Sequence, residues 1–323
     1  MIEIDGSYGE AGGQIIRTSL TLSAITQKPV RITNIRAGRP NPGLQPQHLM
    51  SCKAVRNVCR GTLSHCEIGS TELDFEPGPI VGGKYDFDIG TAGSVTLVAQ
   101  TILPILFKAA KPSSLKITGG THVMKSPSAD YFERVFVPAI GEMGAKMTTK
   151  LVRIGYYPRG GGVLGLEVAP SSLAGIVVWP HDEQIRAIIR YSGLPEGVAI
   201  REKKIFVQNG IERDIFIRQD EALSIGNAVT AWKGLIGSYS LGEKGKRAET
   251  VAQEALDAIK IEKGDVDKHL ADQLLIYGAL AEGKTSYQTS EITEHLKTNA
   301  YIISHFVDRK IGLDKENGKI SVD

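Results

Sequence analysis

The chain has 323 residues, of which 41% are hydrophobic and 23% are charged, as expected for a globular protein of about two domains. Its formal net charge is only +2, so its overall charge does not indicate a nucleic-acid-binding protein, and a polyanion site requires a local cluster of basic residues. The sequence contains no apolar run of the roughly 18 residues needed to span a membrane, no recognisable secretory signal and only three cysteines. We therefore expect a cytoplasmic protein with no membrane partner and no disulfide framework.

The first predicted elements surround a segment with unusual chemistry. DGSYGEAGGQIIRTSL, from Asp5, leads into a helix, and RITNIRAGRPNPGLQPQH, which ends at His48, connects a strand to a second helix. Glycines allow a backbone to approach a ligand closely, arginine binds phosphate through two hydrogen bonds, and a carboxylate can hold a divalent metal. The segment therefore predicts a phosphate site that includes Gly6, Gly9, Gly12, Gly13, Glu10, Arg17, Arg36 and Arg39.

Further along the chain, helix and strand patterns recur as a weak internal repeat. Each unit has a first helix, a strand, a polar loop, a second helix and a closing strand or hairpin. The first helices are GGQIIRTSLTLSAIT, GSVTLVAQTILPILFKAA and KHLADQLLIYGALAEG, and the strands after them are PVRITNI, SSLKITG and KTSYQTS. The second helices are PQHLMSCKAVRNVCR, SADYFERVFVPAIGEMG and TEHLKTNAYIISHFVDR, and the closing segments are ELDFEPG with YDFDIG, KMTTKLV with GVLGLEV, and GLDKENGKISV.

The spacing of the units predicts an insertion in the third one. Gln14 and Ser94 are 80 residues apart, whereas Ser94 and His269 are 175 apart, and the excess of about 95 residues is close to the size of a small domain. We predict an α/β (α+β) fold of three repeated units, each with two helices, and a small inserted α/β domain. Residues 1–178 hold the first two repeats and the start of the large domain, 179–264 form the insert, and 265–323 form the third repeat.

A pseudo-threefold arrangement of such units would bring equivalent loops together. The candidate loops are IRAGRPNPG, GTHVMKSP and SEITEH. This arrangement predicts that Arg36, Arg39, His122, Lys125 and His295 share one cleft.

For several histidines, the sequence does not decide between a structural role and a chemical one. His48 begins a helix, where capping and phosphate contact are equally open, and His295 begins another in EHLKTN, where structural and catalytic roles are equally open. His269 shares a helix face with Gln273, and Asp272 between them could bind a ligand or cap a neighbouring element. The motifs GxxxxGK[ST], GxSxG and HExxH are absent, which argues against P-loop ATPases, common serine hydrolases and zinc proteases.

Taken together, these segments resemble the RNA 3′-terminal phosphate cyclase family along essentially the whole chain. The resemblance is carried, in order, by DGSYGEAGGQIIRTSL, IRAGRPNPGLQPQH, GTAGSVTLVAQTILP, GYYPRGGGVL, HLADQLLIYGAL and EHLKTNA. In the family's glycine-rich signature GxxPxGGG, Arg or His usually precedes the first glycine, whereas here Ile154 precedes Gly155.

The resemblance implies three tandem units, each with a four-stranded sheet and two helices, and a smaller inserted domain. It also implies an ATP-dependent conversion of an RNA 3′-phosphate to a 2′,3′-cyclic phosphate, with AMP and diphosphate as by-products. In the family mechanism, a histidine first takes AMP from ATP, and the AMP then passes to the RNA 3′-phosphate. The neighbouring 2′-OH finally displaces the AMP.

The resemblance also assigns roles to particular residues. His295 matches the nucleophile, and Glu10 matches a glutamate near ATP and its divalent metal, Mg²⁺ or Mn²⁺. Nucleotide-binding positions match Gln100, His269, Leu270, Ala271, Asp272 and Gln273. Polar positions expected to hold substrate phosphates match Arg17, Arg36, Arg39 and Gln47.

Besides a cyclase that binds ATP and RNA with a 3′-phosphate end, two other functions are considered. The alternative is a non-catalytic, cyclase-like protein that binds ribosomal RNA during ribosome assembly; such relatives lack the nucleophilic histidine, whereas this chain has His295. An enolpyruvyl transferase would need about twice as many repeat units, which does not fit 323 residues. An oligomer is possible on either reading.

Overall fold

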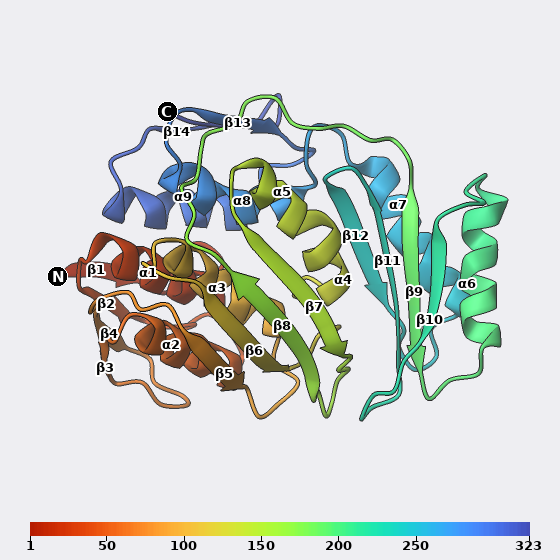
Figure 1. Cartoon of the computed structure of the whole chain (residues 1–323), viewed down its shortest axis with the longest axis horizontal. Coiled ribbons are helices and arrows are strands. Elements are labelled where there is room, and N and C mark those ends of the chain that lie inside the picture. The colour runs from red at the N-terminus through yellow and green to blue at the C-terminus, as the bar shows by residue number, and fades with distance from the viewer.

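The first sheet establishes the pattern of the fold, which is described for all residues 1–323 in a computed structural model (Figure 1). Its elements, in chain order, are β1 (Ile2–Asp5), α1 (Gly13–Thr26), β2 (Val30–Thr33), α2 (Pro46–Val58), β3 (Thr62–Ser64) and β4 (Leu73–Glu76). The strand order is β1-β2-β4-β3, with β1 parallel to β2 and the other neighbours antiparallel. Helix α1 makes the crossover that a parallel strand pair requires.

The second unit repeats this order as β5-β6-β8-β7. Its elements are β5 (Lys84–Asp88), α3 (Val95–Phe107), β6 (Ser113–Gly119), α4 (Ala129–Tyr131), the π-helical turn η1 (Phe132–Phe136), α5 (Val137–Glu142), β7 (Met147–Arg153) and β8 (Gly162–Val168). The π turn lies just before Pro138, whose nitrogen has no hydrogen to donate to the preceding turn.

The third unit has only three named strands, in the order β13-β15-β14. Its elements are α8 (Lys268–Leu280), β13 (Thr285–Gln288), α9 (Glu294–Phe306), β14 (Ile311–Asp314) and β15 (Lys319–Val322). A short segment at Ala174 occupies the place of β1 and β5, because it forms a parallel bridge with Glu282. After a few hydrogen bonds, this segment leaves the sheet and leads into the insert. In the other two units, the loop from the first strand to the first helix begins at this point.

The inserted residues form a separate sheet with its own core. The elements are β9 (Arg186–Ser192), α6 (Gly197–Gln208), β10 (Ile215–Gln219), β11 (Gly226–Lys233), β12 (Ile236–Leu241) and α7 (Ala248–Ile261). The strand order is β10-β9-β11-β12, and α6 and α7 lie at the edge of the molecule farthest from the first sheet (Figure 1). A hydrophobic cluster of 12 buried residues, including Phe206 and Leu256, joins these helices to the sheet.

The predicted fold class, repeated sheet-and-helix units with an additional α/β part, is confirmed. Three expectations differ from the structure. YDFDIG does not form a hairpin with ELDFEPG, because β5 pairs in parallel with β6 and opens the second sheet. Strands β11 and β12 were not predicted, and the third sheet lacks a fourth named strand because the chain departs into the insert.

The helices of the three units pack against one another between the sheets. Helix α1 contacts α2, α3 and α9, and α8 contacts α9 and α5. This packing belongs to a hydrophobic cluster of 60 buried residues. The helices therefore bring the starts of α1, α8 and α9, which are far apart in sequence, into one region. No helix is both long and apolar enough to cross a lipid bilayer.

Asp267 connects the third unit to its neighbours through a buried carboxylate. It caps α8 by accepting hydrogen bonds from the backbone nitrogens of His269 and Leu270 at 2.9 and 3.0 Å. It also accepts from the hydroxyl of Tyr131 at 2.8 Å and from the backbone nitrogen of Gly237 in the insert at 2.9 Å. One carboxylate thus satisfies donors from three parts of the chain.

We expect Asp267→Ala to lower the free energy of unfolding by about 2–4 kcal/mol, because it removes a helix cap and leaves buried donors without a partner. Urea denaturation followed by circular dichroism would measure the change. Asp308→Ala, at an exposed position without side-chain partners, should change it by less than about 0.5 kcal/mol. Equal stability of the Asp267 variant and the wild type would contradict this account.

Candidate functional site

The loop between β1 and α1 runs along the first turns of α9. Gly9 has a φ of +57°, and a Cβ atom there would lie 2.4 Å from Thr298 Oγ1. A Cβ at Gly12 would lie 3.9 Å from His295 Cε1 and 3.7 Å from an Arg39 nitrogen. Only glycine permits this approach at Gly9, and the loop consequently brings the residue that follows Gly9 to the start of α9.

That residue is Glu10, the centre of a three-residue cluster. Its Oε2 lies 3.2 Å from His295 Nε2 and 3.6 Å from an Arg39 terminal nitrogen. The side chains of Glu10, His295 and Arg39 are 39%, 43% and 37% exposed, respectively. The cluster is thus reachable from solvent, and the structure brings together three residues predicted from sequence.

A chain of hydrogen bonds fixes the start of α9. Thr18 on α1 donates to Asn299 Oδ1 at 2.8 Å, and Asn299 Nδ2 donates to the backbone oxygen of Asp272 on α8 at 2.9 Å. Thr293 caps α9 by accepting from the backbone nitrogen of Leu296 at 3.0 Å, and it donates to Asp272 Oδ1 at 2.5 Å. Because three helices share these bonds, His295 in the first turn of α9 has a fixed position.

Arg17 and His48 lie behind the glycines of the loop. A Cβ at Gly13 would lie 2.2 Å from His48 Nε2 and 3.2 Å from an Arg17 nitrogen. Burial lowers the pKa of Arg17 to about 10, so this guanidinium is still charged at neutral pH. Burial, together with the charges of Arg17 and Arg36, lowers the pKa of His48 to about 3, which keeps its imidazole neutral.

The remaining predicted phosphate residues have different surroundings. Arg36 has a φ of +56° and donates from a terminal nitrogen to the backbone oxygen of Asn41 at 3.0 Å. Gln47 accepts from the backbone nitrogen of Ser94 at 3.0 Å, which ties the start of α2 to the start of α3. His48 accepts from the backbone nitrogen of Gln45 at 3.2 Å, so its predicted capping contact is present.

The predicted nucleotide residues lie on α3 and on the first turns of α8. Gln100 Nε2 donates to Gln273 Oε1 at 2.5 Å, which joins the two helices. His269 is exposed at the start of α8. The side chains of Leu270 and Ala271 are fully buried in the main core, and their backbone nitrogens are bonded to Asp267.

The pKa values of His295 and Asp272 are also displaced. Burial lowers the pKa of His295, and the positive charges of Arg17, His269 and Arg39 lower it further, whereas Glu10 raises it. Burial raises the pKa of Asp272 to about 8, and the negative charges of Asp267 and Glu10 contribute to this rise. His295 is therefore neutral at pH 7 and carries a nitrogen lone pair.

The prediction of a shared cleft is wrong for His122. This side chain is buried, and its Nε2 lies 2.9 Å from Asp130 Oδ2. Asp130 is also paired with Arg190 of the insert at 2.6 Å. His122 therefore belongs to a buried polar contact between the second unit and the insert.

Sequence reasoning missed three positioning residues. Gln14 Nε2 donates to the backbone oxygen of His295 at 3.4 Å, and Thr18 and Thr293 take part in the bonds described above. Thr293 had a recognisable signal, because threonine is a preferred residue at the start of a helix. The contacts of Gln14 and Thr18 have no sequence signal, since they depend on how α1 packs against α9.

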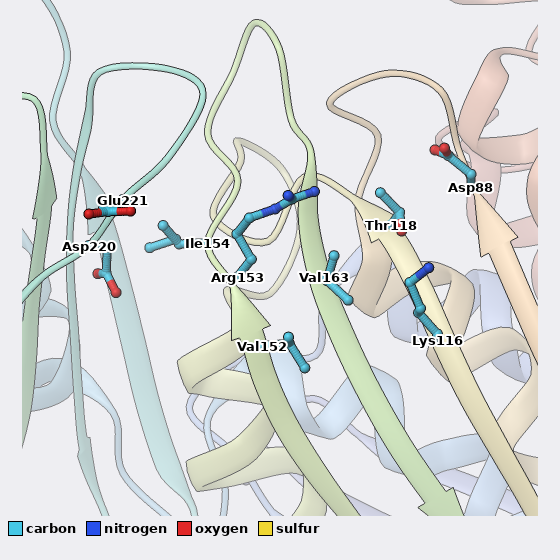
Figure 2. A pocket seen from close by; sticks show the side chains of 9 residues that line it. All are labelled: Asp88, Lys116, Thr118, Val152, Arg153, Ile154, Val163, Asp220 and Glu221. Carbon is cyan, nitrogen blue, oxygen red and sulfur yellow. The ribbon is translucent and has the colours of Figure 1, made fainter.

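A separate cavity lies away from this cluster. It is an open cleft of about 700 Å³ between the second sheet and the insert. Figure 2 shows Lys116 and Arg153 on the strand side, and Asp220 and Glu221 on the loop of the insert. None of the predicted site residues lines this cleft.

Comparison with known proteins identifies the family of this chain. The sequence profile described as RNA 3′-terminal phosphate cyclase matches residues 8–313. The chain therefore belongs to the RNA 3′-terminal phosphate cyclase family.

Individual relatives match over almost their full lengths. A protein of Archaeoglobus fulgidus named RNA 3′-terminal phosphate cyclase is 45% identical, with 96% of this chain and 97% of that protein covered. Proteins of the same name from Methanosarcina barkeri and Pyrobaculum aerophilum are 43% and 42% identical; 100% of this chain is covered in both comparisons, together with 99% and 97% of those proteins. The solved structure of the enolpyruvyl transferase NikO from Streptomyces tendae covers 65% of this chain and 38% of its own, with 12% identity and a TM-score of 0.29, too low to compare the folds.

We expect the His295 imidazole to titrate below the ordinary histidine pKa of about 6.5, because burial and nearby positive charges disfavour its protonated form. Glu10→Gln should lower the midpoint further, since it removes the negative charge that raises this pKa. NMR titration of the histidine ring signals would measure both midpoints. Glu3→Gln, on the exposed side of β1, is the matched control. An upward shift in the Glu10 variant would contradict the assigned electrostatics.

Proposed function

We propose that this chain converts an RNA 3′-terminal phosphate into a 2′,3′-cyclic phosphate in an ATP-dependent reaction. The proposed intermediate is a covalent adduct between His295 and AMP. The observation that carries the proposal is the neutral, accessible imidazole of His295 held next to Glu10 and Arg39, in a chain of the RNA 3′-terminal phosphate cyclase family.

In the first proposed step, a lone pair of the His295 imidazole attacks the α-phosphorus of ATP. A nitrogen–phosphorus bond forms, the bond from the α-phosphorus to the β-bridging oxygen breaks, and diphosphate leaves. A protonated imidazole has no free lone pair, so the lowered pKa of His295 favours this attack. Glu10, 3.2 Å from Nε2, balances the positive charge that the ring gains as the bond forms.

The second and third proposed steps use the stored phosphoryl bond. An oxygen of the RNA 3′-phosphate attacks the phosphorus of the adduct, the nitrogen–phosphorus bond breaks, and AMP is transferred to the RNA end. The neighbouring 2′-OH then attacks the terminal RNA phosphorus, loses its proton and expels AMP. Since the 2′-OH and the phosphate are on the same ribose, this closure needs mainly positioning and charge neutralisation.

The arginines beside His295 are suited to hold the phosphates. Arg17 forms no ion pair and no side-chain hydrogen bond in the protein, and Arg39 has only the 3.6 Å contact with Glu10. Guanidinium groups with free donors bind phosphate oxygens bidentately. We assign Arg17, Arg36 and Arg39 to substrate phosphates, and Gln47 to the support of this site through Ser94.

The nucleotide is assigned to the starts of α8 and α3. His269, Asp272 and Gln273 lie on the first turns of α8, and Gln100 joins Gln273 from α3. Asp272 is buried and bonded to Thr293, so it also orients the helix that carries the nucleophile. Leu270 and Ala271 support this site from the core, where their buried side chains anchor the first turn of α8.

The residues present fit a metal that arrives with the nucleotide. No group of three or more potential side-chain ligands occurs in the chain, so a complete protein cage for a cation is absent. Magnesium is commonly held by one or two carboxylates together with substrate phosphates, and Glu10 is an accessible carboxylate beside the proposed phosphate site. We propose that Glu10 is a protein ligand of Mg²⁺ or Mn²⁺, which when bound would neutralise triphosphate charge.

His295→Ala should abolish transfer of label from ATP labelled in the α-phosphate to the protein in the absence of RNA, because the attacking nitrogen is lost. Acid-labile, protein-bound label would be quantified after denaturing electrophoresis. His65→Ala, at an exposed histidine outside the site, should be labelled like the wild type. Labelling of the His295 variant at the wild-type level would exclude this residue as the nucleophile.

Arg39→Ala should lower kcat/KM for a 3′-phosphorylated oligoribonucleotide by about 100-fold, the loss typical of removing a donor to a reacting phosphoryl or oxyanion group. Cyclised product would be measured by gel electrophoresis. Arg56→Ala, whose guanidinium is exposed and bonds only the adjacent Asn57, serves as the control. Unchanged RNA use by the Arg39 variant would remove this residue from the phosphate site.

A further inference from the structure

Three rings form a row beside the loop that carries Glu10. Tyr8 and Tyr301 are stacked, with ring centroids 3.8 Å apart and 14° between the ring planes. The ring of His305, one turn further along α9, meets Tyr301 edge-on at 4.6 Å. We call Tyr8, Tyr301 and His305 the aromatic row.

The outermost ring of this row is both accessible and fixed. Tyr8 is 41% exposed although Tyr301 covers one of its faces. Gly9, the next residue, rests on Thr298 with no room for a side chain, so the loop cannot move freely away from α9. A stacked and anchored ring loses little conformational entropy when a second planar group binds on its open face.

The aromatic row lies within reach of the proposed nucleophile. Tyr301 follows His295 by six residues on α9, which corresponds to roughly 9 Å along the helix axis. Tyr8 precedes Glu10 by two residues in the loop, and Glu10 Oε2 is 3.2 Å from His295 Nε2. A polynucleotide whose terminal phosphate is held by the arginines beside His295 therefore has its last bases near Tyr8.

We propose that the open face of Tyr8 is a stacking subsite for a nucleobase close to the 3′ end of the RNA substrate. This inference rests on the proposed function, which supplies the RNA end. Aromatic side chains bind single-stranded nucleic acid by stacking on the faces of the bases. Since every base has such a face, the subsite accepts any sequence and distinguishes a polynucleotide end from a small phosphate ester.

The proposal is tested with a 3′-phosphorylated oligoribonucleotide and with matched oligonucleotides that are abasic at one of the last three positions. Tyr8→Leu keeps an apolar contact with Tyr301 but removes the planar face, and Tyr8→Phe keeps both. We expect Tyr8→Leu to lower kcat/KM for the intact RNA by about 5- to 150-fold, and Tyr8→Phe to change it less than 3-fold. With the wild-type protein, kcat/KM for one of the abasic substrates should be lower than for intact RNA by about the same factor. With Tyr8→Leu, removing that base should lower kcat/KM little further.

Transfer of AMP from ATP to the protein without RNA separates this subsite from the first step. It should proceed equally in the wild type, Tyr8→Leu and Tyr8→Phe, because the subsite binds only RNA. Equal use of intact RNA by Tyr8→Leu and the wild type, or the same loss on every abasic substrate, would overturn the subsite. Absence of AMP transfer in the wild type itself would instead overturn the proposed function.

A second measurement uses the wild-type protein and does not depend on how the variants fold. Oligoribonucleotides carrying 2-aminopurine at each of the last three positions report stacking as a loss of fluorescence. We expect protein-dependent quenching at one of these positions. Absence of quenching at all three positions with bound RNA would overturn the subsite.

Discussion

The site depends on the hydrogen bonds that join α1, α8 and α9 across the centre of the molecule. Thr18 binds Asn299, Asn299 binds the backbone of Asp272, and the Asp272 carboxylate binds the Thr293 hydroxyl that caps α9. Buried hydrogen bonds of this kind specify one arrangement, because each group left without a partner costs desolvation energy. The position of His295, in the first turn of α9, follows from this arrangement.

The same packing determines the charge around His295, the proposed nucleophile. The loop from β1 brings Glu10 to His295 because Gly9, which has no room for a side chain, fits against Thr298. Two arginines and one glutamate then surround an imidazole whose pKa is lowered. Burial is the main cause of the lowered pKa, and the positive charge that lowers it further would also favour the approach of phosphates.

The sequence predicted the fold class because its signals are local. Helix periodicity and Gly or Pro breaks define the repeated units, and the unequal spacing of Gln14, Ser94 and His269 indicates extra residues in the third. The pairing of YDFDIG was wrong because strand partners depend on long-range packing: this segment opens the second sheet as β5. Strands β11 and β12 were missed because they contain many small residues, which a period-two pattern does not reveal.

For the candidate site too, the residues in local motifs were predicted, whereas contacts that depend on long-range packing were not. Motifs identified Glu10, Arg39 and His295, and the structure brings these residues together. The Thr18–Asn299 bond and the Tyr8–Tyr301 stack join residues from opposite ends of the chain. No sequence motif predicts either contact. His122 was predicted to share a cleft with His295, but it is buried against Asp130, which also pairs with Arg190 of the insert.

The central claim is that His295 carries AMP, and mass spectrometry of the protein after reaction with ATP tests it most directly. The protein would be digested under neutral conditions, because a phosphorus–nitrogen bond is labile in acid. The account predicts AMP on a peptide that contains His295, with fragment ions that assign it to the imidazole. AMP on the neighbouring Lys297, or on any residue outside α9, would contradict it.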